Sequence, residues 1–126
     1  MATLIDTNII LRYLLADDQE MYEQAVAVIL DGAYTLPESI VEVVYVLTEV
    51  YSLDRERIAQ SVNYVLQDIR TDRREEILEA IETFRTSNLD YVDCLYAAIA
   101  TSGFCDFMTF DKKLMAYIKK RKNSDA

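Results

Sequence analysis

The sequence contains no histidine and no tryptophan, and its 126 residues include only two cysteines, two glycines and one proline. Without histidine, a Ser-His-Asp triad, imidazole acid–base catalysis and zinc sites that need imidazole are all excluded. Cys94 and Cys105 are too few for a disulfide framework and lack the spacing of metal ligands, which favours a reducing, cytoplasmic location. The scarcity of glycine and proline predicts mostly regular structure with short connections.

Long apolar runs are also missing, so we expect no membrane-spanning helix, and the first residues show no secretory leader. Charge is distributed unevenly, because residues 1–111 hold 21 acidic and 7 basic side chains, whereas residues 112–126 hold 1 acidic and 6 basic. The net charge of −9 argues against a simple nucleic-acid-binding protein, which would be basic. The length and the 52% of apolar residues predict one globular domain over residues 1–126, with a basic tail from about residue 119 that frays.

The spacing of apolar residues predicts an alternation of strands and helices. We expect strands over 3–5, 33–36, 68–71 and 106–110, and helices over 9–14, 19–30, 38–51, 54–67, 72–84, 90–102 and 112–120. Such alternation with short connections predicts a three-layer α/β/α fold, in which helices cover both faces of a short, mostly parallel sheet of four to five strands.

Four acidic residues end the predicted strands or open the helices that follow them. They are Asp6, Glu42, Asp93 and Asp111. Ligands of a parallel sheet bind outside the carboxyl ends of its strands, so we expect these carboxylates to meet at one edge. Crowded carboxylates repel one another, and a hard cation such as Mg²⁺ or Mn²⁺ neutralises them. Such an ion activates water and stabilises charge on a phosphodiester, so carboxylates alone suffice for metal-dependent hydrolysis.

Each of these acids also fits a purely structural role. Asp6 and Asp111 are placed to cap helices, and Ser39 to Glu42 matches a capping box. Asp90 and Asp93 suit the positive end of a helix dipole. Every α/β domain has such caps, so the pattern alone leaves both interpretations open.

Four segments resemble, in order, the motifs of PIN domains. They are Leu4-Ile5-Asp6-Thr7-Asn8, the segment 37–47 around Glu42, the segment 89–98 with Asp90 and Asp93, and the segment 108–114 with Thr109-Phe110-Asp111. The resemblance covers nearly the whole chain and implies a PIN-like, metal-dependent ribonuclease fold. It differs from many relatives at the end of the chain, because residues 119–126 do not have the pattern of a further strand.

The resemblance implies roles for particular residues. It implies catalytic acids Asp6, Glu42, Asp93 and Asp111, metal ligands Asp6 and Asp93 for Mg²⁺ or Mn²⁺, supporting residues Thr7, Asn8 and Thr109, and an accessory acid Asp90. Small PIN proteins are most often VapC-type toxins of bacterial toxin–antitoxin pairs, which cleave RNA, form homodimers and are held inactive by an antitoxin. We therefore expect RNA as substrate, an antitoxin protein as partner, and no membrane association.

Phosphate binding requires cations, although most of this chain is acidic. Arg12, near the first motif, and Lys112 and Lys113, beside the fourth, are the candidates. The basic stretch 119–122 is interpreted as cations at a helix C-terminus or as an RNA-docking arm.

The same residues also bear on two other possible functions and on a possible homodimer. A non-catalytic PIN-like module that binds protein or RNA is the main alternative, and the intact set of four acids argues against it. A phosphoacceptor receiver domain needs two adjacent acids after its first strand, where only Asp6 is present. Tyrosines on the predicted helices, namely Tyr22, Tyr45, Tyr51 and Tyr64, predict a homodimer that buries some of them.

Overall fold

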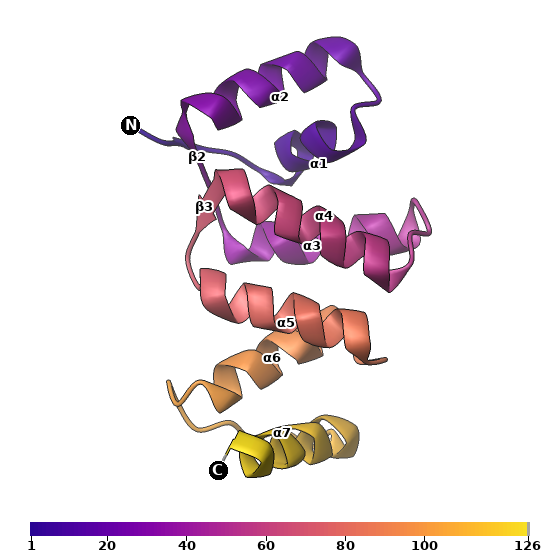
Figure 1. Cartoon of the computed structure of the whole chain (residues 1–126), viewed down its shortest axis with the longest axis vertical. Coiled ribbons are helices and arrows are strands. Elements are labelled where there is room, and N and C mark those ends of the chain that lie inside the picture. Colours follow the sequence, from indigo (N-terminus) through magenta and orange to yellow (C-terminus); the bar gives the residue numbers. More distant parts are fainter. Residues whose placement is uncertain (126) are drawn as a thin grey trace. The chain divides into compact units, whose positions relative to one another are not determined.

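A computed structural model of the chain describes residues 1–125, which are mostly helical (Figure 1). The chain divides into two compact units, Met1–Arg74 and Glu75–Ala126, and each is treated separately below. The expected single domain over residues 1–126 stays a prediction.

The first unit follows the predicted alternation of strands and helices. Its elements are β1 (Thr3–Leu4), α1 (Thr7–Leu15), α2 (Gln19–Gly32), β2 (Ala33–Thr35), α3 (Pro37–Glu49), α4 (Arg55–Asp68) and β3 (Ile69–Thr71). The valine-rich segment of α3 is helical, as its length and the separation of its glutamates predicted. Its core-facing residues recur at helical spacing and include Ile40, Val43 and Leu47, all of which are buried.

The sheet of the first unit has three parallel strands in the order β1–β2–β3. Ala33 and Ile69 pair in register and are both buried. Thr35 is buried as well, and its hydroxyl donates to the main-chain carbonyl of Ile5 at 2.8 Å. Since side chains alternate between the faces of a strand, these residues define the core face of the sheet. Helix α2 contacts β2 and helix α4 contacts β3.

The opposite face of this sheet is open. Leu4, Tyr34 and Arg70 lie at corresponding positions of the three strands, where Leu4 and Arg70 are exposed and Tyr34 is half-buried. The structure therefore differs from the expectation that helices cover both faces. Strands of two or three residues place one such side chain each on this face, and that small apolar area creates little need for a covering helix.

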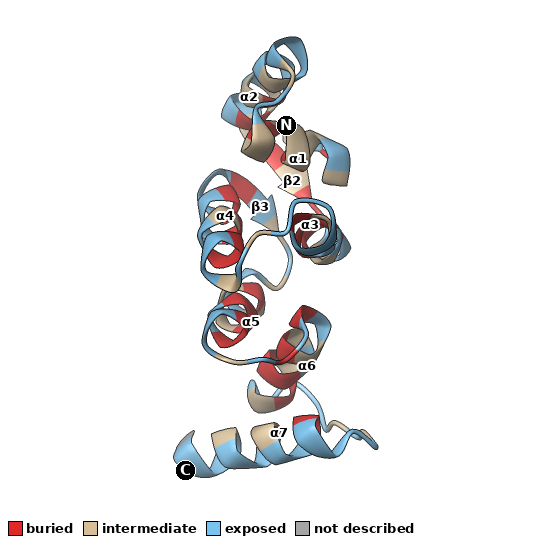
Figure 2. Cartoon of the chain, turned by 90° about the vertical axis from the view of Figure 1, so that its right-hand side faces the viewer, coloured by how far each residue is buried: buried red, intermediate tan, exposed pale blue. Residues whose placement is uncertain are grey.

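The second unit contains α5 (Arg74–Thr86), which begins at the boundary, α6 (Tyr91–Thr101) and α7 (Lys112–Asp125). Ala97 and Ala100 of α6 pack with Leu114 and Ile118 of α7 in a buried cluster. The small alanine side chains let the two helices approach closely. Figure 2 shows that α7 is otherwise mostly exposed.

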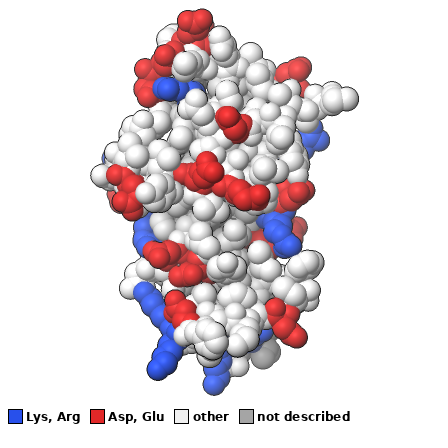
Figure 3. Space-filling view, turned by 180° about the vertical axis from the view of Figure 1, so that it is seen from behind, with Lys and Arg blue, Asp and Glu red and all other residues white. Residues whose placement is uncertain are grey.

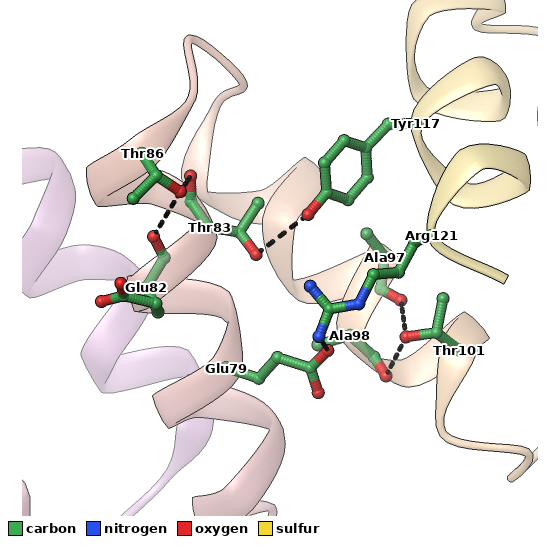
Figure 4. Close-up of polar contacts among 9 residues, drawn as sticks. All are labelled: Glu79, Glu82, Thr83, Thr86, Ala97, Ala98, Thr101, Tyr117 and Arg121. Atoms are coloured by element: carbon green, nitrogen blue, oxygen red, sulfur yellow. Dashed lines mark hydrogen bonds and ion pairs between the residues drawn. The ribbon is translucent and has the colours of Figure 1, made fainter. Parts of the chain in front are cut away.

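Polar contacts join α5 to α7 beside this cluster (Figure 4). Arg121 donates to Oε1 of Glu79 at 2.9 Å, and the hydroxyls of Thr83 and Tyr117 lie 3.3 Å apart. The hydroxyl of Thr101 donates within its own helix, to the main-chain carbonyls of Ala97 and Ala98. Exposed ion pairs add little stability, so the apolar cluster contributes more than the Glu79–Arg121 pair.

The predicted buried strand over 106–110 is wrong. The structure has no strand there, and Met108 and Phe110 are 79% and 90% exposed. Phe107 is the apolar residue of this segment that packs, with its ring 5.3 Å from that of Tyr96 between centroids. An apolar run shows that a segment can be buried, but strand formation also needs a pairing edge, which local sequence does not report.

Helix α7 extends to Asp125, five residues beyond the expected end at 120. The expectation that this last segment forms no strand is confirmed for residues 112–125. Within the part of the chain that the structure describes, no helix combines the length and the apolar character needed to cross a bilayer.

Stacked tyrosines hold the helices of the first unit together. The ring of Tyr13 stacks on Tyr22 and Tyr64, with centroids 6.4 and 5.5 Å away. The buried Tyr13 hydroxyl lies 3.2 Å from both the Tyr64 hydroxyl and Oδ2 of Asp68, and it donates to them. Desolvation, followed by the contacts with Tyr64 and Asp68, raises the pKa of Tyr13 above its ordinary value.

The change Tyr13→Phe keeps the ring stack but removes this hydroxyl. We expect the free energy of unfolding to fall by about 1 kcal/mol, because a part-buried hydrogen bond to a carboxylate is lost. Urea unfolding followed by circular dichroism measures the change. Tyr96→Phe, at a tyrosine that is 49% exposed, is the matched control and should be neutral. Equal stability of Tyr13→Phe and the wild type would contradict the assignment.

Candidate active site

Asp6 lies where β1 gives way to α1. Its backbone is extended and its Oδ1 accepts a hydrogen bond from the amide of Ile9 at 3.2 Å, so it caps α1 as the structural interpretation predicted. Its side chain is nevertheless exposed and lines a cavity of about 510 Å³ together with Asn8 and Ser39. We call this the Asp6 cavity. Its second carboxylate oxygen therefore has access to a ligand in the cavity.

Glu42 does not form the predicted capping box. Helix α3 begins at Pro37, its N-cap is Leu36, and no side chain caps it. Instead, Oε2 of Glu42 accepts a hydrogen bond from the hydroxyl of Thr7 at 2.8 Å. Thr7 follows Asp6 directly, so this bond holds Glu42 against the start of α1, next to the residue that caps it.

Asp93 lies in the first turn of α6, and Asp90 is the N-cap of this helix without a capping hydrogen bond from its side chain. The pKa of Asp93 is raised above its usual value, first by desolvation and then by the negative charges of Asp111 and Asp90. The positive charge of Lys113 acts in the opposite direction. In the second unit, the charges of Asp90, Asp111 and Lys113 therefore all act on the carboxylate of Asp93.

Asp111 precedes α7 and combines a structural role with its effect on Asp93. Its Oδ1 accepts from the amide of Leu114 at 3.0 Å, and its own amide donates to Oγ1 of Thr109 at 3.0 Å. Thr109 thus orients the backbone that carries Asp111.

The three residues proposed for phosphate contact differ in their surroundings. Arg12 donates to Oδ1 of Asp17 at 3.0 Å, so part of its guanidinium is already occupied. Lys112 and Lys113 are exposed at the start of α7, and the charge of Lys113 acts on Asp93. Figure 3 shows a face on which acidic side chains are spread widely and long basic side chains gather toward the α7 end.

The structure thus assembles the predicted residues in two sets. In the first unit, Glu42 accepts a hydrogen bond from Thr7, the residue that follows Asp6. In the second unit, Asp90 and Asp111 act on Asp93. Within residues 1–125, no group of three or more His, Cys, Asp and Glu side chains has the arrangement of a metal site.

Sequence reasoning missed two features of these sets. It did not identify Glu42 as the partner of Thr7, which no local pattern could show at a separation of 35 residues. It assigned Lys113 to substrate alone, and no local pattern shows that the charge of Lys113 acts on Asp93. Apart from Lys113, both sets consist of side chains with carboxylate or hydroxyl groups. Oxygen ligands of this kind suit Mg²⁺ and Mn²⁺.

Comparison with known proteins bears on this arrangement. The family model described as the PIN domain matches residues 3–120. Searches of curated proteins and of solved structures give no match. The family match includes all four acids and both units. Because it spans nearly the whole chain, the protein belongs to the PIN domain family.

Proposed function

We propose that the protein is an endoribonuclease that hydrolyses RNA phosphodiester bonds with Mg²⁺ or Mn²⁺ as cofactor. PIN domains are commonly metal-dependent nucleases. The observation that supports the proposal is the Thr7–Glu42 hydrogen bond, which holds the carboxylate of Glu42 at the residue that follows Asp6.

The chemistry assigns a task to each group. Asp6 and Asp93 would hold the cation, with Glu42 and Asp111 as the other acids. When bound, a divalent cation supplies a water of lowered pKa and stabilises negative charge on the phosphodiester. Thr7 fixes the orientation of Glu42, and Thr109 orients the backbone of Asp111. In the Asp6 cavity, Asn8 offers an amide for contact with the RNA backbone.

A biological role follows from the kind of PIN protein that this chain resembles. The family match over residues 3–120 supports a VapC-like toxin of a toxin–antitoxin pair in the cytoplasm. In this role an antitoxin protein would bind the nuclease and hold it inactive. A non-catalytic PIN-like binding module is the alternative, and the presence of all four acids disfavours it.

Asp6→Asn and Asp93→Asn test catalysis directly. Asparagine caps a helix about as well as aspartate, so both variants should fold normally. Each variant replaces a negatively charged ligand of the cation with a neutral amide. We expect RNA cleavage in the presence of Mn²⁺ or Mg²⁺ to fall by about 100-fold or more, the usual loss when a group that stabilises the transition state is removed. Gel analysis of a labelled RNA measures the rate.

The matched controls are Asp31→Asn and Asp106→Asn, which change an exposed aspartate in each unit. Both should cut RNA at the wild-type rate, and chelation of the metal should stop all cleavage. A folded wild-type protein that cuts no RNA with either metal would instead support the binding module.

Stability without metal provides a readout that does not depend on activity. Asp93→Asn removes the repulsion from Asp111 and Asp90, so the metal-free variant should be more stable by up to about 1 kcal/mol, a value limited by solvent screening. Added Mn²⁺ should raise the melting temperature of the wild type more than that of the variant. Calorimetry in chelator and in Mn²⁺ measures both. A wild type that Mn²⁺ does not stabilise would contradict the proposed ligand role.

We also propose a homodimer, supported by exposed tyrosines on the helices. Tyr45 is 65% exposed, and Tyr51 and Tyr64 are exposed as well, whereas Tyr22 is half-buried and stacks on Tyr13.

Light scattering should give the mass of a dimer. Tyr45→Ser should weaken the dimer by about tenfold or more, because a buried interface tyrosine contributes strongly. Gln60→Ser, at an exposed polar position of α4, is the control, and a monomeric wild type at high concentration would refute the assembly.

A further inference from the structure

The open face of the sheet in the first unit carries a hollow. Its volume is about 750 Å³, and Leu4, Tyr34, Arg70 and Arg74 are among the residues that line it. We call it the sheet-face hollow. The first three of these side chains lie in register across the three strands, so they form one continuous strip on the face of the sheet.

The hollow is positively charged within an acidic unit. Two of the seven basic residues before position 112 line it, and no acidic residue does. Arg12 and Arg85 of the same seven form ion pairs with neighbouring acids, whereas Arg70 and Arg74 form none among the described residues. This concentration of cations is complementary to an anionic ligand.

The geometry of Arg74 favours a fixed cation. Its Nε and Nη2 donate to the carbonyl of Leu66 at 3.3 and 3.2 Å. These bonds anchor the guanidinium at the edge of the hollow while its remaining N–H groups stay available to a ligand. A guanidinium that is held in place loses little entropy when it binds phosphate.

The aromatic ring of Tyr34 lies between the apolar Leu4 and the cationic Arg70. The neighbouring carboxylate of Asp72 raises the pKa of the Tyr34 hydroxyl, so the hydroxyl end of this ring lies near an acid. Proteins that bind single-stranded nucleic acid combine a basic surface along the backbone with aromatic rings on which bases stack. The sheet-face hollow contains both components.

The hollow is connected with the candidate active site. Leu4 lines both the sheet-face hollow and the Asp6 cavity. The sheet-face hollow and the Asp6 cavity therefore adjoin at Leu4.

We propose that the sheet-face hollow binds a single-stranded segment of RNA, with a base against Tyr34 and phosphates at Arg70 and Arg74. The neighbouring part of the same strand then extends past Leu4 into the Asp6 cavity. The second statement rests on the proposed nuclease function, whereas the binding itself does not require cleavage.

The test measures the affinity for a fluorescent single-stranded oligouridylate by anisotropy, in chelator, so that no RNA is cut. We expect Tyr34→Leu to weaken binding by about tenfold, through loss of base stacking. Tyr34→Phe keeps the ring and should bind like the wild type. Arg70→Gln should weaken binding several-fold and lower the salt dependence by the equivalent of about one phosphate contact. Arg57→Gln, at an exposed arginine of α4, should change neither quantity.

Wild-type affinity in both Tyr34→Leu and Arg70→Gln would overturn the proposal, and so would a wild type that does not bind the oligonucleotide. Light scattering on the same variants identifies the other possible occupant. If they lose a dimer and keep their RNA affinity, the hollow is a contact between two copies of the chain and the proposal is wrong. Melting temperatures exclude unfolding as the cause.

The experiment also separates this proposal from the nuclease function. A wild type that binds RNA through Tyr34 and Arg70 but cuts nothing with Mn²⁺ supports the hollow and refutes the nuclease. A wild type that cuts RNA while the hollow variants retain full affinity supports the nuclease and refutes the hollow.

Discussion

The hydrogen bond between Thr7 and Glu42 links the residue next to the α1 cap with the second turn of α3. It forms because β1 ends at the point where Asp6 turns the chain into α1, and because α3 begins at Pro37, too early for Glu42 to reach its N-terminus. The bond holds the carboxylate of Glu42 at the residue that follows Asp6. In a chain without histidine, the proposed chemistry depends on carboxylates that are positioned in this way.

Local sequence predicted the elements better than the contacts between them. The order of strands and helices up to Thr71 follows from apolar spacing, and the cap at Asp6 follows from residue type. The strand predicted over 106–110 is wrong, and the alternative of a capping box at Ser39 to Glu42 fails because Glu42 accepts from Thr7, 35 residues away. Neither a contact at such a separation nor the pairing that a strand requires is visible in local sequence.

The distribution of charge reconciles an acidic protein with the proposed RNA substrate. Acidic side chains outnumber basic ones by 22 to 13, but Arg70 and Arg74 lie together beside the open sheet face, and Lys112 is exposed at the start of α7. The remaining acidic surface repels phosphate and would limit nonspecific binding. Net charge alone is therefore a poor guide to what this chain binds.

The shortness of β1 affects how the protein behaves on warming. Two residues of an edge strand, joined to a single neighbour, hold few main-chain hydrogen bonds, whereas the helices of the same unit are anchored by a buried core. Segments with so few contacts open at a lower free energy than the molecule as a whole. Ile5 alone separates Asp6 from β1, so detachment of this strand moves the carboxylate while the helices remain intact. The geometry around Asp6 is thus less durable than the fold that surrounds it.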